Sequence, residues 1–114
     1  MAISEHASGS EAVSTTEWSC TTDTAGPDVD TTDGVFQVFI QVSDMVTGDE
    51  LQIRIYEKVQ STDTQRICYE ATLIGPQSPS CFVTPTFVLM HGWDVTLDAI
   101  AGTITVYWVI KKVV

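Results

Sequence analysis

The chain has 114 residues, of which 44% are hydrophobic and 18% charged, and its formal net charge is −10. This length suits one domain with a single modest core, and a field of this sign repels nucleic-acid phosphates and anionic membranes. No apolar run approaches the ~20 residues of a membrane-spanning helix, and residues 1–17 lack the basic and apolar regions of a secretory signal. We therefore expect no nucleic-acid or membrane partner.

The charge is unevenly distributed, because ten of the fifteen acidic residues lie in residues 1–50 and the first basic residue is Arg54. This asymmetry suits a partner with a basic surface, although acids can also simply keep an apolar-rich β protein soluble. Three cysteines, Cys20, Cys68 and Cys81, cannot all pair within one chain, and their spacing is not that of a zinc site. They fit folding in a reducing cytoplasm, and whether any two of them pair stays open.

Residues 1–12 show no hydrophobic periodicity, so we expect a flexible N-terminal arm there and a single β domain over 13–114. Residues 13–22 have the composition of a strand. The following stretch, 23–34, contains Asp23, Asp28, Asp30 and Asp33. Calcium loops supply several oxygen ligands, but this spacing lacks the EF-hand pattern with its terminal Glu. We expect an acidic surface loop and no metal.

A hairpin is the clearest pattern in the chain. Residues 51–59 place Leu51, Ile53 and Ile55 on one side and polar residues on the other, and strand side chains alternate between the faces of a sheet. Pairing this strand with residues 65–73 brings their apolar sides together. In that register, Leu51 lies opposite Leu73, Ile53 opposite Ala71, Ile55 opposite Tyr69 and Tyr56 opposite Cys68.

The same register places Arg54 opposite Glu70, an ion pair that contributes about 0.2–1 kcal/mol. Glu57 falls opposite Ile67, on the apolar side near the end of the strand. Because an unpaired buried carboxylate is costly, we expect Glu57 to accept hydrogen bonds from Arg66, Gln65 or backbone at the hairpin end. The alternative is that this end of the hairpin is simply hydrated.

Further strands are expected at 35–42, at 81–90 with an interruption at Pro85, at 93–97 and at 103–114. Proline removes a donor from the ladder, so the strand at 81–90 should lie at a sheet edge or contain a bulge. With about seven strands, short connections and no helical period, the sequence predicts an all-β fold. We expect an antiparallel β-sandwich or a jelly-roll-like barrel.

The last strand becomes apolar on both faces towards its end. A small domain with one hydrated face does not need this, so another subunit or the N-terminal arm could cover the second face. Burial of a central strand within one sandwich explains the pattern equally well. The candidate interface residues are Tyr107, Trp108, Val109, Ile110, Val113 and Val114, together with Pro85 on the expected edge strand.

Catalytic chemistry finds little support in the sequence. Asp49, Glu50, Asp94 and Asp98 contain enough carboxylates for a glycosidase pair, but no spacing places two of them at the required separation. His91 has no nucleophile beside it in the sequence, and a structural role is expected. We expect no enzyme activity, catalytic residue or cofactor.

A longer motif runs from Asp44 to Arg66 and reads Asp44-Met-Val-x-Gly48-Asp49-x-Leu51-x-Ile-Arg54-x-x-Glu57-Lys58-Val59-x-Ser61-x-x-Thr64-Gln65-Arg66. It continues through Tyr69-x-Ala71, Gly75-x-Gln77, Leu89-Met-His91-Gly-Trp93 and Ala101-Gly102-Thr103. Over roughly residues 33–112, the chain resembles small β-rich proteins encoded among the structural genes of tailed bacteriophages.

The resemblance implies a non-enzymatic virion protein, and capsid decoration (cement) proteins match best in size. It implies a homo-oligomer, commonly a trimer, that is made in the host cytoplasm and binds the major capsid protein on the capsid surface. It implies no catalytic residues and does not include residues 1–32. Two alternatives remain. One is a receptor- or carbohydrate-binding module of a tail fibre, using exposed Trp or Tyr side chains. The other is a different head or tail component, such as a connector subunit.

Overall fold

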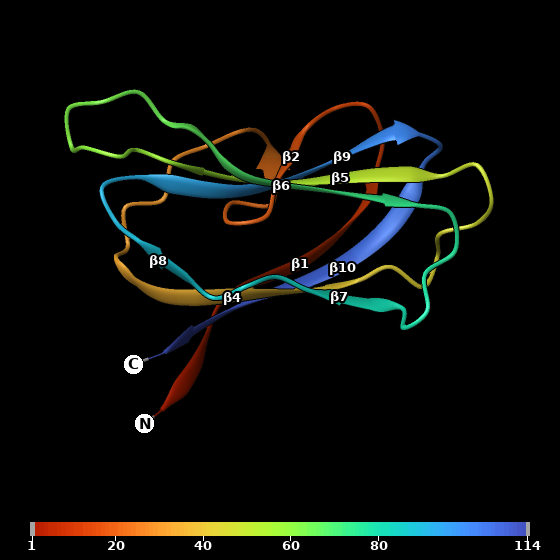
Figure 1. Cartoon of the computed structure of the whole chain (residues 1–114), viewed down its shortest axis with the longest axis horizontal. Helices are drawn as coiled ribbons and strands as arrows, with labels where there is room; N and C mark the ends of the chain where they lie inside the picture. Colours follow the sequence, from red (N-terminus) through yellow and green to blue (C-terminus); the bar gives the residue numbers. More distant parts are fainter. Residues whose placement is uncertain (1, 114) are drawn as a thin grey trace.

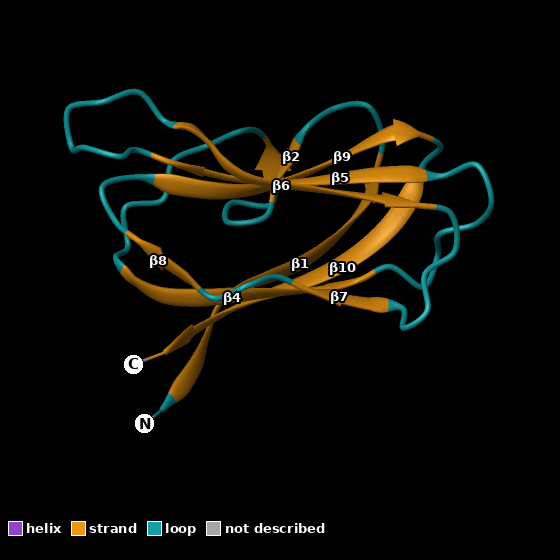
Figure 2. Cartoon of the chain, in the orientation of Figure 1, coloured by secondary structure: helices purple, strands orange, loops and turns teal. Residues whose placement is uncertain are grey.

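The computed structural model describes residues 2–113, and its regular structure consists of β-strands in two stacked layers (Figure 1, Figure 2). Sheet A has the order β1-β10-β4-β7, with β8 also paired to β4, and sheet B has the order β3-β2-β9-β5-β6. All pairings are antiparallel. The strands are β1 (Ile3–Val13), β2 (Trp18–Ser19), β3 (Thr24–Ala25), β4 (Gly34–Gln41), β5 (Glu50–Glu57), β6 (Arg66–Ile74), β7 (Cys81–Val83), β8 (Phe87–Leu89), β9 (Trp93–Ala101) and β10 (Ile104–Val113).

The expected all-β fold is confirmed, and of the two expected architectures the chain adopts the sandwich, not a closed barrel. The core lies between the sheets because alternate residues of each long strand point inward. Each fully buried Ile, Leu or Phe side chain contributes about 1.5–3 kcal/mol through the hydrophobic effect. The largest fully buried side chains are Trp93, Phe36, Ile40, Leu51, Ile53, Ile55, Leu97, Ile104 and Ile110.

The described part of the expected arm, residues 2–12, is not separate from the β domain. Ile3–Val13 is instead strand β1, which pairs with β10 from Ile3–Val113 to Val13–Ile104 and forms one edge of sheet A. Hydrophobic periodicity is weak here because the inward positions before Val13 are occupied by the small residues Ala7 and Gly9 and by Glu11. A Cβ on Gly9 would lie 2.7 Å from Trp108 Cζ2, so glycine lets β1 approach that indole.

The hairpin register is confirmed for its first half and wrong for its second. Leu51, Ile53, Arg54 and Ile55 have the partners that we expected. The register then shifts by one residue at a bulge, so Tyr56 lies opposite Ile67 and Glu57 opposite Arg66. Side-chain alternation fixes a register along regular strands, but a bulge adds an unpaired residue that leaves no hydrophobic signal.

The strand expected over 81–90 is split, as proline predicts. β7 and β8 both pair with β4 at the second edge of sheet A, and residues 84–86, including Pro85, lie between them. Thr84 bridges the interruption, because its N–H donates to Val38 O (3.0 Å) and its Oγ1 accepts from Val38 N (3.1 Å). The edge position of this segment is therefore confirmed.

Candidate interaction surface

The outer side of sheet A is unusually apolar. Along β4, residues 36, 38 and 40 are buried, so Val35 and Phe39 point outward, and the same alternation turns Tyr107 and Val109 of β10 outward. Tyr107 is 50% exposed and Val88 is 75% exposed. We call this surface the apolar face, and its residues are Ile3, Val35, Phe39, Val83, Val88, Tyr107, Val109 and Val113.

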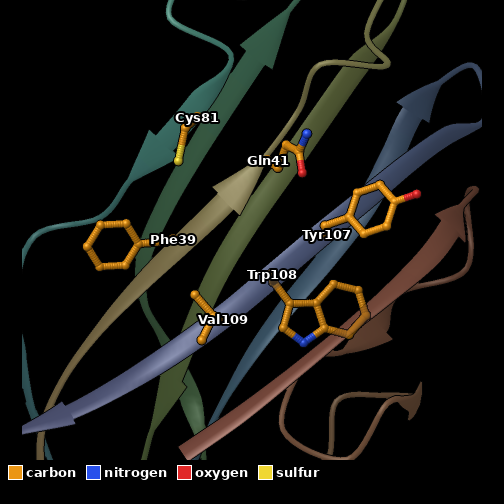
Figure 3. Close-up of a pocket in the computed structure, with 6 residues that line it drawn as sticks. All are labelled: Phe39, Gln41, Cys81, Tyr107, Trp108 and Val109. Atoms are coloured by element: carbon orange, nitrogen blue, oxygen red, sulfur yellow. The ribbon is translucent and has the colours of Figure 1, made fainter. Parts of the chain in front are cut away.

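Two hollows of similar size lie on the apolar face, and Phe39 lines both. The first, of about 260 Å³, lies between Phe39 on one side and Tyr107 on the other, with Val109 and Cys81 at its border (Figure 3). The second, of about 270 Å³, is lined by Phe39, Ile3, Phe36, Gln37, Thr86, Lys111 and Val113. The paired ends of β1 and β10 project outward beyond the lower sheet at this end (Figure 1).

The apolar face carries almost no net charge. Among the outward positions of the described sheet A strands, the charged residues are Glu5 and Lys111, which are register partners. Lys111 Nζ lies 3.9 Å from the centroid of the Phe39 ring, a cation–π contact. The net charge of −10 is therefore concentrated elsewhere on the molecule.

The structure divides the expected interface residues into two groups. Tyr107, Val109 and Val113 lie on the apolar face. Trp108 (4% exposed) and Ile110 (0%) point into the core instead, because neighbours in a strand face opposite ways. The Trp108 Nε1–H donates to Cys20 O at 3.0 Å, although the edge of this residue still lines the first hollow.

The two remaining residues of that expected interface lie elsewhere. Pro85 is exposed at the neighbouring edge of sheet A, in the gap between β7 and β8. Val114 is outside the described residues. The central position of β10, between β1 and β4, explains the inward half of its apolar pattern.

The outer side of sheet B is centred on a bonded polar network, although β6 and β9 also expose Ile67, Ile74 and Ile100. The Arg54 guanidinium lies 2.9 Å from Glu70, 3.1 Å from Asp98 and 3.5 Å from Glu17. Glu17 also accepts hydrogen bonds from Tyr56 Oη (2.6 Å) and from the Thr96 hydroxyl (2.5 Å). The expected Arg54–Glu70 ion pair is thus confirmed within a larger network, which shares one cation among three carboxylates.

Protonation follows from these contacts. Burial raises the pKa of Tyr56 to about 12, and the hydrogen bond to the Glu17 carboxylate adds to this effect. Burial also raises the pKa of Asp98, although Arg54 opposes the shift. These groups bind each other, so the network holds sheet B together and presents no pair of free carboxylates.

The other hairpin residues have local partners. Glu57 Oε1 accepts the backbone N–H of Met90 at 2.7 Å, which ties the end of β5 to the segment after β8. Glu57 therefore accepts a hydrogen bond, but the expected donors at the hairpin end are wrong, because the donor belongs to the segment after β8. Arg66 pairs with Asp63 at 3.5 Å, across an exposed turn.

Buried Asp94 organises the acidic loop, a role that the sequence did not predict. Its Oδ1 accepts from the hydroxyls of Ser19 (2.9 Å) and Thr21 (2.7 Å) and from Val95 N, and its Oδ2 accepts from Asp28 N at 2.7 Å. Burial raises the pKa of Asp94, and these hydrogen bonds partly offset the shift. A polar residue between two buried apolar ones in β9 was the available signal.

The loop aspartates also bind the chain itself. Asp30 Oδ2 lies 2.7 Å from His6 Nε2, and the His6 ring packs against Phe36 and Trp93. Asp23 accepts from the indole N–H of Trp18 at 3.0 Å. Within residues 2–113, no cluster of three or more His, Cys, Asp or Glu side chains is arranged to hold a metal.

The three cysteines are unpaired. Cys68 and Cys81 are exposed, whereas Cys20 is buried, and burial raises the pKa of the Cys20 thiol, with Asp94 and Asp23 adding to the effect. Among the residues once considered for catalysis, Asp49 Oδ2 accepts a local backbone N–H from Val46 at 3.0 Å. His91 sits in the turn before β9, with a φ of 69°.

Comparisons with known proteins add no relative. No protein-family model matches the chain, and no curated protein or solved structure matches it. The described part of the chain also has no helix long and apolar enough to cross a membrane. The outer sides of sheets A and B are therefore the features of the molecule that bear on its function.

Proposed function

We propose that this protein is a non-enzymatic structural protein of a bacteriophage virion, a capsid decoration protein that binds the major capsid protein. The observation that carries the proposal is the division of the surface into an apolar face, with Tyr107, Val109 and Val113, that suits self-association, and an acidic remainder that suits the shell. Exposed apolar side chains that gather on one side of a small domain are typical of a site of protein association. The resemblance of residues 33–112 to phage structural proteins gives the setting.

The polar regions of the molecule support a binding role and not a catalytic one. Arg54, Asp94 and Asp30 each engage other groups of the same chain, so the titratable side chains with the most contacts have structural roles. The acidic surface away from the apolar face suits a basic patch on the capsid shell. Self-association is part of the same proposal.

The test is to count copies of this protein in purified virions of the phage that encodes it. Quantitative mass spectrometry, with the major capsid protein as the internal standard, should find the two in comparable amounts. The purified protein should also co-sediment with capsids that lack it. Its absence from virions, or its presence in only a few copies per particle, would overturn the proposal.

A carbohydrate-binding module is the second candidate, and one observation favours it. Tyr107 is half exposed beside a hollow, and sugars stack on such aromatic side chains. However, Trp93 and Trp108 are buried and unable to form a platform. A glycan array distinguishes the two candidates, because binding that is lost in Tyr107→Ser would favour the module.

A further inference from the structure

We propose that a second copy of this chain covers the apolar face, so that two copies pack through their A sheets about a two-fold axis. This inference deepens the proposed function. The dimer is argued from the structure of the chain, and only its location in the virion rests on the proposed function. It names what occupies the apolar face, whereas the capsid would meet the acidic remainder. Charge, area and shape each support this occupant.

Charge is the first argument. A molecule with a net charge of −10 repels a second copy of itself wherever its acids lie. The outward positions of sheet A offset one acid, Glu5, with one base, Lys111. The outer side of sheet B, in contrast, has Glu17, Glu70 and Asp98 around a single arginine. Two copies therefore meet with least repulsion through their A sheets.

Area is the second argument. The molecule measures 40 × 32 × 20 Å, with its strands running along the longest axis and the sheets seen edge-on down the shortest one (Figure 1). The outer side of each sheet therefore spans about 40 by 20 Å. Specific and stable interfaces bury about 800 Å² on each partner, so a dimer would use most of the outer side of sheet A, including the polar residues Gln37 and Gln41.

Shape is the third argument. The apolar face has both a projecting side chain, Tyr107, and two hollows of about 260 and 270 Å³. A two-fold interface pairs each surface feature with its complement on the same surface of the other copy. If the two-fold axis lies between the sheets and crosses β10 at right angles near Val109, Tyr107 of one copy comes towards the Lys111 end of the other, where the second hollow lies. The projecting ends of β1 and β10 would border the paired sheets.

The test is sedimentation velocity on the purified full chain from about 1 to 100 μM, a range that brackets micromolar dissociation constants. We expect a dimer of about twice the 12.5 kDa chain mass. Val109→Glu places an unpaired charge in the centre of the contact, and we expect dissociation to become at least about 30-fold easier. Tyr107→Ser, which adds no charge, should weaken the dimer less.

Thr72→Glu is the matched control, because it adds the same charge at an exposed position of β6 in sheet B and should leave the dimer intact. Circular dichroism confirms that each variant is folded. A monomeric wild-type chain at 100 μM, or an oligomer that Val109→Glu leaves unchanged, would overturn the inference. A trimer would overturn the two-fold pairing, whether or not Val109→Glu dissociates it. Copy number in virions is measured separately, so this inference and the proposed function can fail independently.

Discussion

The outer faces of the two sheets use their side chains in different ways. On sheet B, Arg54, Tyr56 and Glu17 bind one another, and the ordered acidic loop is anchored through buried Asp94. On sheet A, Tyr107 is half exposed beside one of two hollows, Ile3 is exposed beside the other, and Val88 is exposed on the same side. Polar groups that are satisfied internally stabilise a fold, whereas exposed apolar groups leave free energy available for binding. The outer side of sheet B therefore stabilises the fold, whereas the outer side of sheet A is available for association.

The largest expected effect tests the stabilising role of the sheet B side. Asp94→Ala should lower the free energy of unfolding by about 3 kcal/mol, because two backbone N–H groups and two hydroxyls lose their acceptor in a buried site. Chemical denaturation measures the change. Asp33→Ala removes an exposed aspartate of the same loop and should change stability by less than about 0.5 kcal/mol. Equal effects of the two substitutions would contradict the role of Asp94.

Gly9→Ala tests how β1 is held at the edge of sheet A. The added Cβ would lie 2.7 Å from Trp108 Cζ2, and overpacking of this kind destabilises a fold by about 2 kcal/mol. Thermal unfolding should show the loss, while Ser10→Ala at the exposed neighbouring position serves as the control. If Gly9→Ala were as stable as the wild type, β1 would not pack against the indole as described.

A smaller effect concerns the Arg54–Glu70 pair on sheet B. Glu70 is 44% exposed and Arg54 is shared among three carboxylates, so a double-mutant cycle should give a coupling of about 0.2–1 kcal/mol. The coupling should shrink at high salt because the pair is near the surface. A coupling above about 2 kcal/mol, or one insensitive to salt, would mean that this network is more deeply buried than the structure shows.

The smallest effect appears only at acidic pH. Burial raises the pKa of Asp30, but hydrogen bonds from His6 and Thr32 outweigh this, and the pKa lies below its ordinary value. The ionised form is therefore stabilised in the folded state. That stability is present above the unfolded-state pKa of about 3.9 and is lost as pH falls through the lower folded-state value. In His6→Ala, the stability between pH 5 and 2 should depend less steeply on pH. An unchanged slope would count against the His6–Asp30 contact.

Side-chain alternation made much of sheets A and B predictable. The pattern in residues 51–55 and 69–73 determined a register that is correct at every pair. In the last strand, both sets of alternate residues become apolar, and this pattern placed Tyr107 and Val109 on the side opposite Trp108 and Ile110. The same reasoning did not show which of the two pairs points outward, because a strand pattern gives two faces without saying which one meets the other sheet.

The features that were not predicted lack a periodic signal. β1 is held mainly by backbone pairing to β10, with small inward residues at Ala7 and Gly9, so its sequence resembles that of a mobile arm. The bulge opposite the end of β5 adds one residue without changing composition. Asp94 depends on partners up to 75 residues away in the chain, such as Ser19, and only the folded structure brings these groups together.

The most direct test of the contrast between the two faces is oxidative footprinting by mass spectrometry, comparing Tyr107 on sheet A with Tyr56 on sheet B. The account predicts that Tyr107, which is 50% exposed in the single chain, becomes protected in concentrated protein and in virions. Tyr56, whose hydroxyl is bound to Glu17, should react equally in dilute protein, in concentrated protein and in virions. Unchanged reactivity of Tyr107 under all three conditions would contradict the claim that the apolar face is covered.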